Sequence, residues 1–334
     1  MAEILVLSKG EDSPSTRYRA LQFFDRLTGA GHRPCCQVLS GGAGNVLRAL
    51  RAARRADLVL VQRKTLPKPL LWMLRRLARR LIFDFDDAIF CRPNGGSSAT
   101  RMRRFAAMVR CCDHVTAGNG YLAQAAARFN PDVTVIPTGV DVDRYRVDVT
   151  PPSDYFDVVW IGSSSTRKYI EAALPALRQA ARRIPSLRLK IVADFDLTDS
   201  GLPTLAVPWR SDSEALDLVS AQVGIAPMWD DDWSRGKCAL KVLQYMAAGL
   251  PVVSSPAGVN AEVVIPGVTG FLAGDDAAWA DALHQLAGSA ELRQKMGEAG
   301  RQRVAALYSK DFAFGKLMAV LEAVADGRKQ GHRR

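Results

Sequence analysis

The sequence has few of the residues and motifs that mark several common enzyme classes. It contains four histidines, and it has no HExxH zinc motif, no GxSxG nucleophile elbow and no Walker phosphate loop. No GxGxxG follows the first apolar segment, as it would in a dehydrogenase. Metalloprotease, serine hydrolase, ATPase and dehydrogenase activities therefore have little support.

Disulfide patterns and membrane-spanning segments are missing as well. The six cysteines include two adjacent pairs, Cys35 with Cys36 and Cys111 with Cys112, and adjacent cysteines are poor disulfide partners. No run approaches the roughly 18 apolar residues of a spanning helix, and residues 1–7 show neither a basic leader nor a cleavage site. We expect a cytoplasmic chain with reduced thiols that does not span a membrane.

Positive charge is concentrated in the first half of the chain. The formal net charge is +11, and residues 1–150 hold 24 basic and 13 acidic side chains, so the remainder is close to neutral. A positive electrostatic field of this kind could attract nucleic acid, an anionic membrane or an acidic acceptor. It is equally compatible with a basic surface that only faces solvent. Residues 66–83 contain a basic amphipathic helix that either covers a sheet or touches an anionic membrane. Because no nucleic-acid-binding motif occurs, we expect no nucleic-acid partner.

Apolar segments of strand length alternate with segments of helical periodicity, which predicts parallel sheets wrapped by helices. The predicted strands are 4–7, 58–62, 81–84, 114–117 and 133–137, followed by 158–162, 187–192, 224–227, 251–254 and 271–273. A chain of 334 residues is long enough for two domains, and two adjacent prolines place a linker at 148–153. Ligands of such sheets bind at the carboxyl ends of the strands, so we expect the site in a cleft between the domains.

The most informative segment is 233–255. Its periodicity predicts a helix over 237–248, ended by a glycine and a proline. Lys237 and Lys241 then lie in the first turns, where exposed amides and the helix dipole favour an anion such as a diphosphate. Gln244, one turn further, is predicted to bind ribose hydroxyls.

This segment, together with the GVTGFL run at 267–272, resembles the C-terminal signature of the family 4 retaining glycosyltransferases, also called group 1. The signature has one glutamate, seven further residues, and a second glutamate that opens an EAMAxGxPVV run. This chain has Gly236 and Gln244 at those two positions. The resemblance implies that Gln244 binds the donor ribose, and it leaves sugar contacts to Lys237 or to the acids at 230–232.

Two further loops are candidates for the donor site. Segment 160–169 is a strand, a small-residue loop and a helix start, with amides, hydroxyls and cations that can cradle a phosphate. Its candidate donor-binding residues are Gly162, Ser163, Ser164, Thr166 and Lys168. The family often has an arginine at Ser163 and a lysine near Lys168, and helix capping is the competing explanation. In the second loop, Gly258 and Glu262 match the family's glycine-rich loop and following glutamate, or they serve only as a turn residue and a helix-entry acid.

The first half contains candidates for acceptor or phosphate contacts. Segment 15–19 follows the first strand and resembles the family's SxRxR segment. Arg17 and Arg19 are therefore candidates, unless both are solvated residues of a helix start. Asn119 and the run 136–141 also match family segments at the ligand edge of the first domain, and the run equally suits a hinge.

Three carboxylates follow one another at the end of a predicted strand. Asp84, Asp86 and Asp87 resemble the D-x-DD segment of one branch of the family. Clustered carboxylates raise one another's pKa, so we predict Asp86 and Asp87 as a general base or as groups that position the acceptor hydroxyl. Asp84 is a predicted acceptor or phosphate contact. Metal binding is the rival use, as in the DxD motif of single-domain GT-A transferases, but the two-domain pattern favours a site without metal.

The sequence and the resemblance together predict an α/β protein of the GT-B fold, with two Rossmann-like domains facing each other across a cleft. The predicted parts are an acceptor-binding domain at 1–150, a nucleotide-sugar-binding domain at 151–310, a helix at 311–326 that returns to the first domain, and a flexible basic tail at 327–334.

The predicted activity is transfer of a hexosyl group from a UDP- or GDP-sugar to an acceptor hydroxyl, with retention as the resemblance implies, and without a cofactor. Lys237 and Lys241, with Lys168, would stabilise the leaving diphosphate. The acceptor is a glycan, a lipid-linked glycan or a small metabolite, and a peripheral contact with the inner membrane face is part of the prediction. Because the two glutamates are missing, a noncatalytic nucleotide-sugar-binding protein of the same fold is the alternative.

Overall fold

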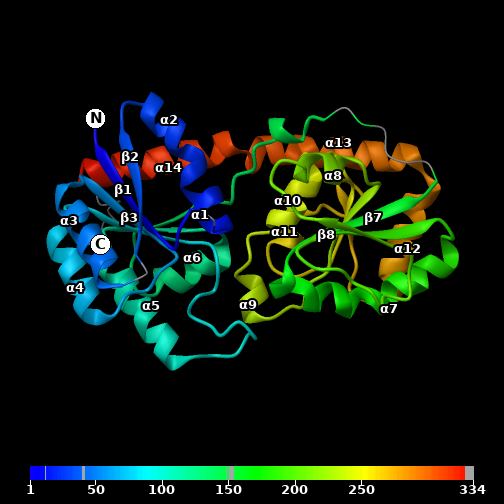
Figure 1. The fold of residues 1–334 in the computed structure, drawn as a ribbon, viewed down its shortest axis with the longest axis horizontal. Coiled ribbons are helices and arrows are strands. Elements are labelled where there is room, and N and C mark those ends of the chain that lie inside the picture. Colours follow the sequence, from blue (N-terminus) through cyan, green and yellow to red (C-terminus); the bar gives the residue numbers. More distant parts are fainter. Residues whose placement is uncertain (12, 40–41, 148, 150–153, 328–334) are drawn as a thin grey trace. The chain divides into compact units, whose positions relative to one another are not determined.

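The computed structural model describes residues 1–11, 13–39, 42–147, 149 and 154–327. They form two compact units (Figure 1). Unit 1 consists of Met1–Gly139, Arg235–Cys238 and the C-terminal segment that begins at Lys310, and unit 2 consists of Val140–Ser234 and Ala239–Ser309. The predicted linker at 148–153, apart from Val149, lies outside the described residues, and so do the predicted boundary at 150 and the tail beyond Gly327.

Unit 1 is built on a six-stranded parallel sheet in the order β2-β1-β3-β4-β5-β6. Its strands are β1 (Glu3–Ser8), β2 (Arg33–Val38), β3 (Leu58–Gln62), β4 (Leu81–Phe85), β5 (His114–Ala117) and β6 (Val133–Val135). The apolar segments of the sequence predict all of these strands except β2. That strand lies at the sheet edge with half-exposed and exposed side chains, so it has no continuous apolar run.

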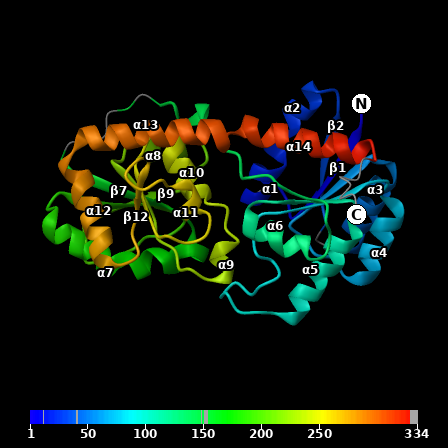
Figure 2. The ribbon, with the colours of Figure 1, turned by 180° about the vertical axis from the view of Figure 1, so that it is seen from behind.

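The last helix, α14 (Lys310–Ala325), covers one face of this sheet (Figure 2). On the same face, η1 (Leu21–Phe23) lies between α1 (Pro14–Arg19) and α2 (Phe24–Gly29). The apolar cluster that joins them includes Ile4, Val6, Phe23, Ala313, Leu317, Val320, Leu321 and Val324. The prediction of a C-terminal helix that returns to the first domain is confirmed.

The opposite face of the unit 1 sheet is covered by α3 (Ala43–Arg55), α4 (Lys68–Leu77), α5 (Ala99–Cys111) and α6 (Gly120–Ala127). Each has a stripe of apolar residues that is buried against the strands. The Phe105 ring of α5, for example, lies with its centroid 6.3 Å from that of Phe83 and 5.2 Å from that of Phe85. Alternate residues of β4 therefore anchor the helix layer on this face.

Unit 2 repeats the architecture with a parallel sheet in the order β12-β11-β10-β7-β8-β9. Its strands are β7 (Phe156–Ile161), β8 (Leu187–Ala193), β9 (Thr204–Pro208), β10 (Val223–Ala226), β11 (Val252–Ser254) and β12 (Gly270–Leu272). The sequence pattern predicts five of them and does not predict β9, again a half-exposed edge strand. The predicted α/β class with two Rossmann-like sheets is confirmed.

Helices cover both faces of the unit 2 sheet. α7 (Arg167–Arg183) and α12 (Asp276–Gly288) pack together on one apolar cluster. α8 (Glu214–Val219) and α10 (Leu240–Ala247) pack on a second cluster, with α11 (Asn260–Val263) beside α10 and α13 (Ala290–Leu307) along both clusters. The short elements are η2 (Asp143–Tyr145), η3 (Ser164–Thr166) and α9 (Asp232–Arg235). No helix among the described residues is both long and apolar enough to cross a lipid bilayer.

Helix α13 approaches the end of α10 backbone to backbone at Gly297. A Cβ added there would lie 1.9 Å from the carbonyl oxygen of Gly249. A backbone carbonyl cannot move aside as a flexible side chain can, so we expect Gly297→Ala to destabilise unit 2 by about 1–3 kcal/mol. The measurement is the melting temperature by circular dichroism.

Gly288→Ala is the matched control for this prediction. Gly288 is the last residue of α12, and a Cβ added there would meet no atom within 4 Å. Alanine favours the helix more than glycine does, so the melting temperature of this variant should stay equal or rise slightly. Equal melting temperatures for the two variants would contradict the packing argument.

Candidate active site

The first candidate site lies where β7 ends in unit 2, in the β7 loop, which comprises residues 162–166. Gly162 is required there because an added Cβ would lie 2.1 Å from the ring of Trp160. After it, Ser163 and Thr166 form a capping box, in which each side chain accepts a hydrogen bond from the backbone NH of the other. The loop therefore does contain the helix cap that was the competing explanation. Whether the loop also contacts a phosphate stays a prediction.

Two further predicted donor residues already have interactions in this region. The backbone NH of Ser164 donates to Oδ1 of Asp194 at 2.7 Å, so a carboxylate occupies one of the amides predicted to bind phosphate. The ammonium of Lys168 lies 4.9 Å from the ring centroids of both Tyr169 and Trp229. These rings form an edge-to-face pair beside it. The side chain of Lys168 is therefore held by cation–π contacts.

Helix α10 places Lys241 against the β7 loop. The Lys241 ammonium donates to Oγ1 of Thr166 at 3.2 Å and lies 4.0 Å from the centroid of the Trp160 ring. The helix begins at Leu240, because Ala239 adopts a left-handed conformation with φ of 53° and interrupts the helical path. The prediction of a helix that starts at Lys237 is wrong, and only Lys241 lies in a first turn.

Lys237 belongs to unit 1, where its ammonium donates to Oδ1 of Asp87 at 2.7 Å. The side-chain amide of Asn119 donates to the carbonyl oxygens of Arg235 and Lys237 at 3.1 and 3.0 Å. Oδ1 of the same residue accepts from the backbone NH of Leu122 and so caps α6. Asn119, a predicted acceptor contact, thus holds the backbone that carries Lys237.

Gln244, the predicted ribose ligand, lies in the core of unit 2. Its side chain is only 4% exposed, and Nε2 donates to the hydroxyl of Tyr145 at 3.3 Å. That hydroxyl donates to Glu214, whose second carboxylate oxygen accepts from the indole NH of Trp209 at 2.9 Å. The sequence pattern does not predict this network, because its members are scattered along the chain and only Gln244 belongs to a motif.

The loop after β11 contains the two remaining donor candidates. Gly258 has a φ of 50°, a left-handed conformation that favours glycine. Glu262 lies on α11 with an exposed side chain, and its backbone carbonyl accepts from Arg303 at 2.9 Å. Nearby, Asn260 donates to Oγ of Ser254 at 2.9 Å and fixes the start of the helix to the end of β11. The Glu262 carboxylate is therefore accessible, and its contact with a donor stays a prediction.

Arg19 and Asp84 form a buried ion pair in unit 1. Nε and Nη2 of Arg19 donate to the two carboxylate oxygens at 3.2 and 2.5 Å, and Nη1 donates to the carbonyl of Ile136. Thr116 completes the set by donating to Asp84 at 2.7 Å. Burial opposes the charge of Arg19, but the ion pair and hydrogen bonds with Asp84 outweigh it and raise the pKa of the guanidinium. Both side chains are thus used inside the fold, whereas Arg17 of α1 is half-buried.

Asp86 and Asp87 are contacted by an arginine that the sequence motifs do not identify. Arg63 follows β3 with a left-handed φ of 56°, and its NH donates to the carbonyl of Asp84 at 2.6 Å. Its guanidinium pairs with Asp87, lies 3.8 Å from Asp86 and donates to the hydroxyl of Ser15. In the sequence, an arginine directly after a strand cannot be told from an ordinary surface residue. Its role becomes visible only in the structure, through its positive φ and its contacts with the two aspartates.

The thiol of Cys238 lies next to the backbone of Asp86. It donates to the carbonyl of Asp86 at 3.4 Å, and a Cβ added to Gly118 would lie 2.4 Å from its sulfur. Burial, assisted by the negative charge of Asp86, raises the pKa of this thiol to about 12. Cys238 therefore stays protonated and packs as a small side chain.

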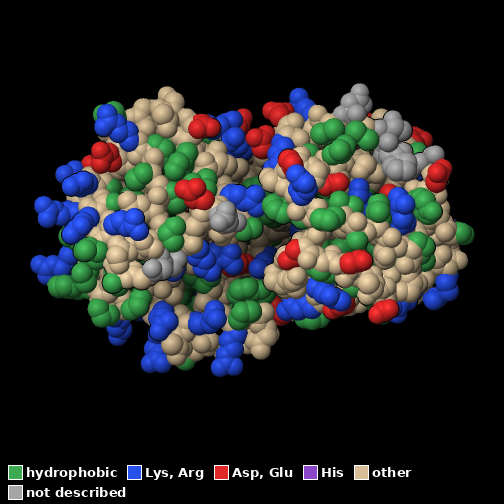
Figure 3. Space-filling model, in the orientation of Figure 1, with side chains coloured by type: hydrophobic (Ala, Val, Ile, Leu, Met, Phe, Trp, Pro, Cys, Tyr) green, Lys and Arg blue, Asp and Glu red, His purple; other side chains and the backbone are tan. Residues whose placement is uncertain are grey.

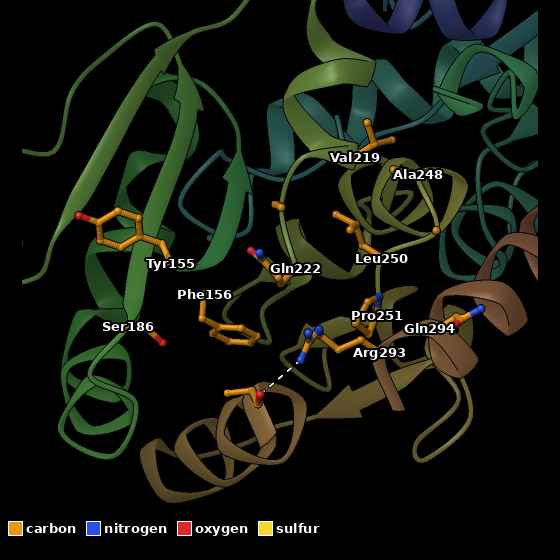
Figure 4. A pocket seen from close by; sticks show the side chains of 13 residues that line it. Tyr155, Phe156, Ser186, Val219, Gln222, Ala248, Leu250, Pro251, Arg293 and Gln294 are labelled. Atoms are coloured by element: carbon orange, nitrogen blue, oxygen red, sulfur yellow. Dashed lines mark hydrogen bonds between the residues drawn. The ribbon is translucent and has the colours of Figure 1, made fainter. Parts of the chain in front are cut away.

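The described residues around these groups offer no cluster of metal ligands, and a pocket of unit 2 lies away from them. No group of three or more His, Cys, Asp or Glu side chains suited to a metal occurs among the described residues. A pocket of about 520 Å³ opens in unit 2 near Phe156, Gln222, Pro251 and Arg293 (Figure 4). These residues stand at the amino ends of β7, β10 and β11 or face them, whereas the β7 loop leaves the carboxyl end. The pocket contains none of the predicted site residues.

Comparison with known proteins agrees with this arrangement. Residues 156–289 match the family described as "Glycosyl transferases group 1". The chain is 28% identical over 263 residues to a D-inositol 3-phosphate glycosyltransferase of Streptomyces scabiei, covering 68% of this chain and 56% of the relative. It is 26% identical to an Arthrobacter protein of the same name, with 59% and 51% covered. The chain spans about half the length of the curated relatives that it matches.

Solved structures share the fold across nearly the whole chain. Anabaena Alr3699/HepE in complex with UDP and glucose gives a TM-score of 0.74 at 17% identity, covering 97% of this chain and 100% of that one. Sucrose-phosphate synthase of Thermosynechococcus elongatus gives 0.77 at 17% identity, covering 98% and 100%.

Over residues 156–289 the chain is thus similar to the group 1 glycosyl transferases. Its fold is GT-B, as the sequence resemblance predicts. The match at 156–289 includes the β7 loop, Lys241 and Gln244, so the similarity covers the part of the chain that carries most of the predicted donor residues.

The buried pair of unit 1 allows a test of whether Arg19 is structural. Arg19→Met would leave Asp84 buried beside an apolar side chain, and loss of one partner of a buried pair costs about 3–5 kcal/mol. We expect a clear fall in the urea concentration at which unit 1 unfolds. Arg51→Met, at an exposed position of α3, is the control and should leave that midpoint unchanged. Equal midpoints for both variants would show that Arg19 does not hold the fold.

Proposed function

We propose that this protein is a group 1 glycosyl transferase that moves a hexosyl group from a nucleotide-sugar to an acceptor hydroxyl, with retention of configuration. The observation that carries the proposal is the position of Lys241. Its ammonium is fixed between Thr166 and the Trp160 ring at the first turn of α10, beside the β7 loop. A cation at a helix start favours a diphosphate, the leaving group of nucleotide-sugar chemistry.

The fixed position of Lys241 matters for the rate of transfer. As the bond to the sugar breaks, negative charge grows on the diphosphate, and a cation that is already in place stabilises that charge without reorganising. The capping box that fixes Thr166 orders the loop before a donor binds. Gly258 and Glu262 are proposed as further donor contacts, with Gly258 allowing a close approach of the backbone.

For the acceptor we propose the carboxyl edge of the unit 1 sheet. Asp87 bridges Arg63 and Lys237. We therefore assign Asp87 the positioning of Lys237, and we assign Asp86, whose side chain is 14% exposed, the positioning of the acceptor hydroxyl. Arg17 is proposed as a contact for an anionic group of the acceptor.

Donor, compartment and metal use complete the proposal. The Anabaena protein has been solved with UDP-glucose, and this favours a UDP-sugar over a GDP-sugar for the present chain. All six cysteines lie at described positions and none of them is joined in a disulfide, which fits the reducing cytoplasm.

Fixed lysines are proposed in place of a divalent metal. A peripheral contact with an anionic membrane is retained from the sequence prediction.

A noncatalytic nucleotide-sugar-binding protein is the second candidate. It is favoured by the amide at Gln244, which stands where the family has a carboxylate and is hydrogen-bonded to Tyr145 in the core. The two candidates share the donor site and differ only in the reaction.

Release of UDP from UDP-sugars separates them. We expect the protein to release UDP from one UDP-hexose, at least slowly by hydrolysis, and faster when an extract containing acceptors is added. Mass spectrometry of the extract should find a product heavier by one hexosyl residue. Tight UDP binding without any release, across a panel of UDP- and GDP-sugars, would establish the noncatalytic candidate instead.

Substitution of Lys241 tests the donor site directly. A hydrogen bond to a charged group contributes about 1.5–3 kcal/mol, so we expect Lys241→Met to weaken UDP binding by about tenfold or more in calorimetry. Lys295→Met, at an exposed position of α13, is the control and should bind UDP like the wild type. Wild-type affinity in a folded Lys241→Met protein would remove Lys241 from the donor site.

A further inference from the structure

The outer face of unit 1 has an unusual distribution of charge. Helices α3, α4 and α5 lie next to one another along this face (Figure 1). Within their bounds the sequence contains no aspartate or glutamate. The three helices carry eleven basic side chains, Arg48, Arg51, Arg54, Arg55, Lys68, Arg75, Arg76, Arg101, Arg103, Arg104 and Arg110, which together define the basic helix face.

Almost all of these cations point outward and are not neutralised. Ten are exposed, and the eleventh, Arg75, is half-buried and pairs with Asp113. None of the ten forms an ion pair with a carboxylate in the part of the chain that the structure describes. The space-filling view shows Lys and Arg side chains gathered over these helices with few acids between them (Figure 3). This contrasts with the opposite charges that alternate on an ordinary solvated surface.

Large apolar side chains stand among these cations. Trp72 is 61% exposed and Met73 is 43% exposed, and both lie on α4; Leu47 of the neighbouring α3 is 48% exposed. The guanidinium of Arg76 lies 4.8 Å from the centroid of the Trp72 ring. The buried side of α4 is supplied by Leu71 and Leu74 instead, so the packing of unit 1 does not need Trp72.

We infer that the basic helix face is a docking surface for an anionic phospholipid membrane, with α4 lying in the plane of the membrane interface. The cations match the negative headgroups, and the tryptophan with its apolar neighbours can enter the boundary between headgroups and acyl chains. A nucleic acid would also meet the cations, but its backbone offers no apolar phase for Met73 and Leu47. This inference gives the proposed peripheral contact a defined surface, and it holds whether or not the chain transfers a sugar.

The test uses the whole chain and lipid vesicles, without any donor. We expect the protein to sediment with vesicles that contain phosphatidylglycerol, and to stay in solution with vesicles of phosphatidylcholine alone. Replacing Arg51, Arg54 and Arg104 together by glutamine should reduce binding at least tenfold. Trp72→Ala combined with Met73→Ala should reduce it severalfold at unchanged charge, because only a bilayer rewards apolar insertion.

Two matched controls come from unit 2. Leu216→Ala removes a side chain that is 46% exposed, and Arg182→Gln removes an exposed cation of α7; neither should change vesicle binding. The inference is overturned if the anionic vesicles do not bind the protein, or if the Trp72 and Met73 double variant binds them as well as the wild type. It is also overturned if a DNA duplex at the same salt concentration displaces the vesicles from the protein. Since no sugar is transferred in this assay, its failure would leave the proposed transferase activity standing.

Discussion

The candidate donor site depends on the contacts that the Trp160 ring makes with its neighbours. The ring is fully buried at the end of β7, it leaves no room for a side chain at position 162, and it supports the ammonium of Lys241. The next strand residue, Ile161, donates its NH to the hydroxyl of Tyr245 on α10 at 2.8 Å, so the same helix is tied to the same strand end a second time. A loop and a helix start are thereby fixed relative to each other before any ligand is present.

The two units use their charges differently. In unit 1, the charges at the carboxyl edge of the sheet are paired inward: Arg19 with Asp84, and Arg63 and Lys237 with Asp87. On the basic helix face of the same unit, every cation except Arg75 is exposed and has no carboxylate partner among the described residues. The excess positive charge seen in the sequence is therefore not spread evenly, because the helices α3 to α5 carry eleven basic side chains and no acid.

The sequence predicts the fold better than the site, and the reason is physical. A central parallel strand is buried on both faces, so it leaves a continuous apolar run, whereas the edge strands β2 and β9 do not. Periodicity also predicts that the helix continues through Ala239. An alanine gives no sign in the sequence that its backbone is left-handed, so the true helix start at Leu240 is missed. The partners of Gln244 and Asp87 come from distant parts of the chain, and no local pattern reveals whether a polar side chain will face a ligand or another side chain.

Unit 1 is built from segments that are far apart in the sequence, and this affects the order in which the two units can fold during translation. Its core unites Ile4 and Val6 of β1 with Leu317 and Leu321 of α14. Residues 140–309 contain all of unit 2, and they leave the exit tunnel before that helix does. The unit whose translation begins first is therefore completed only after unit 2, and until α14 emerges the apolar residues on one face of the unit 1 sheet stay exposed.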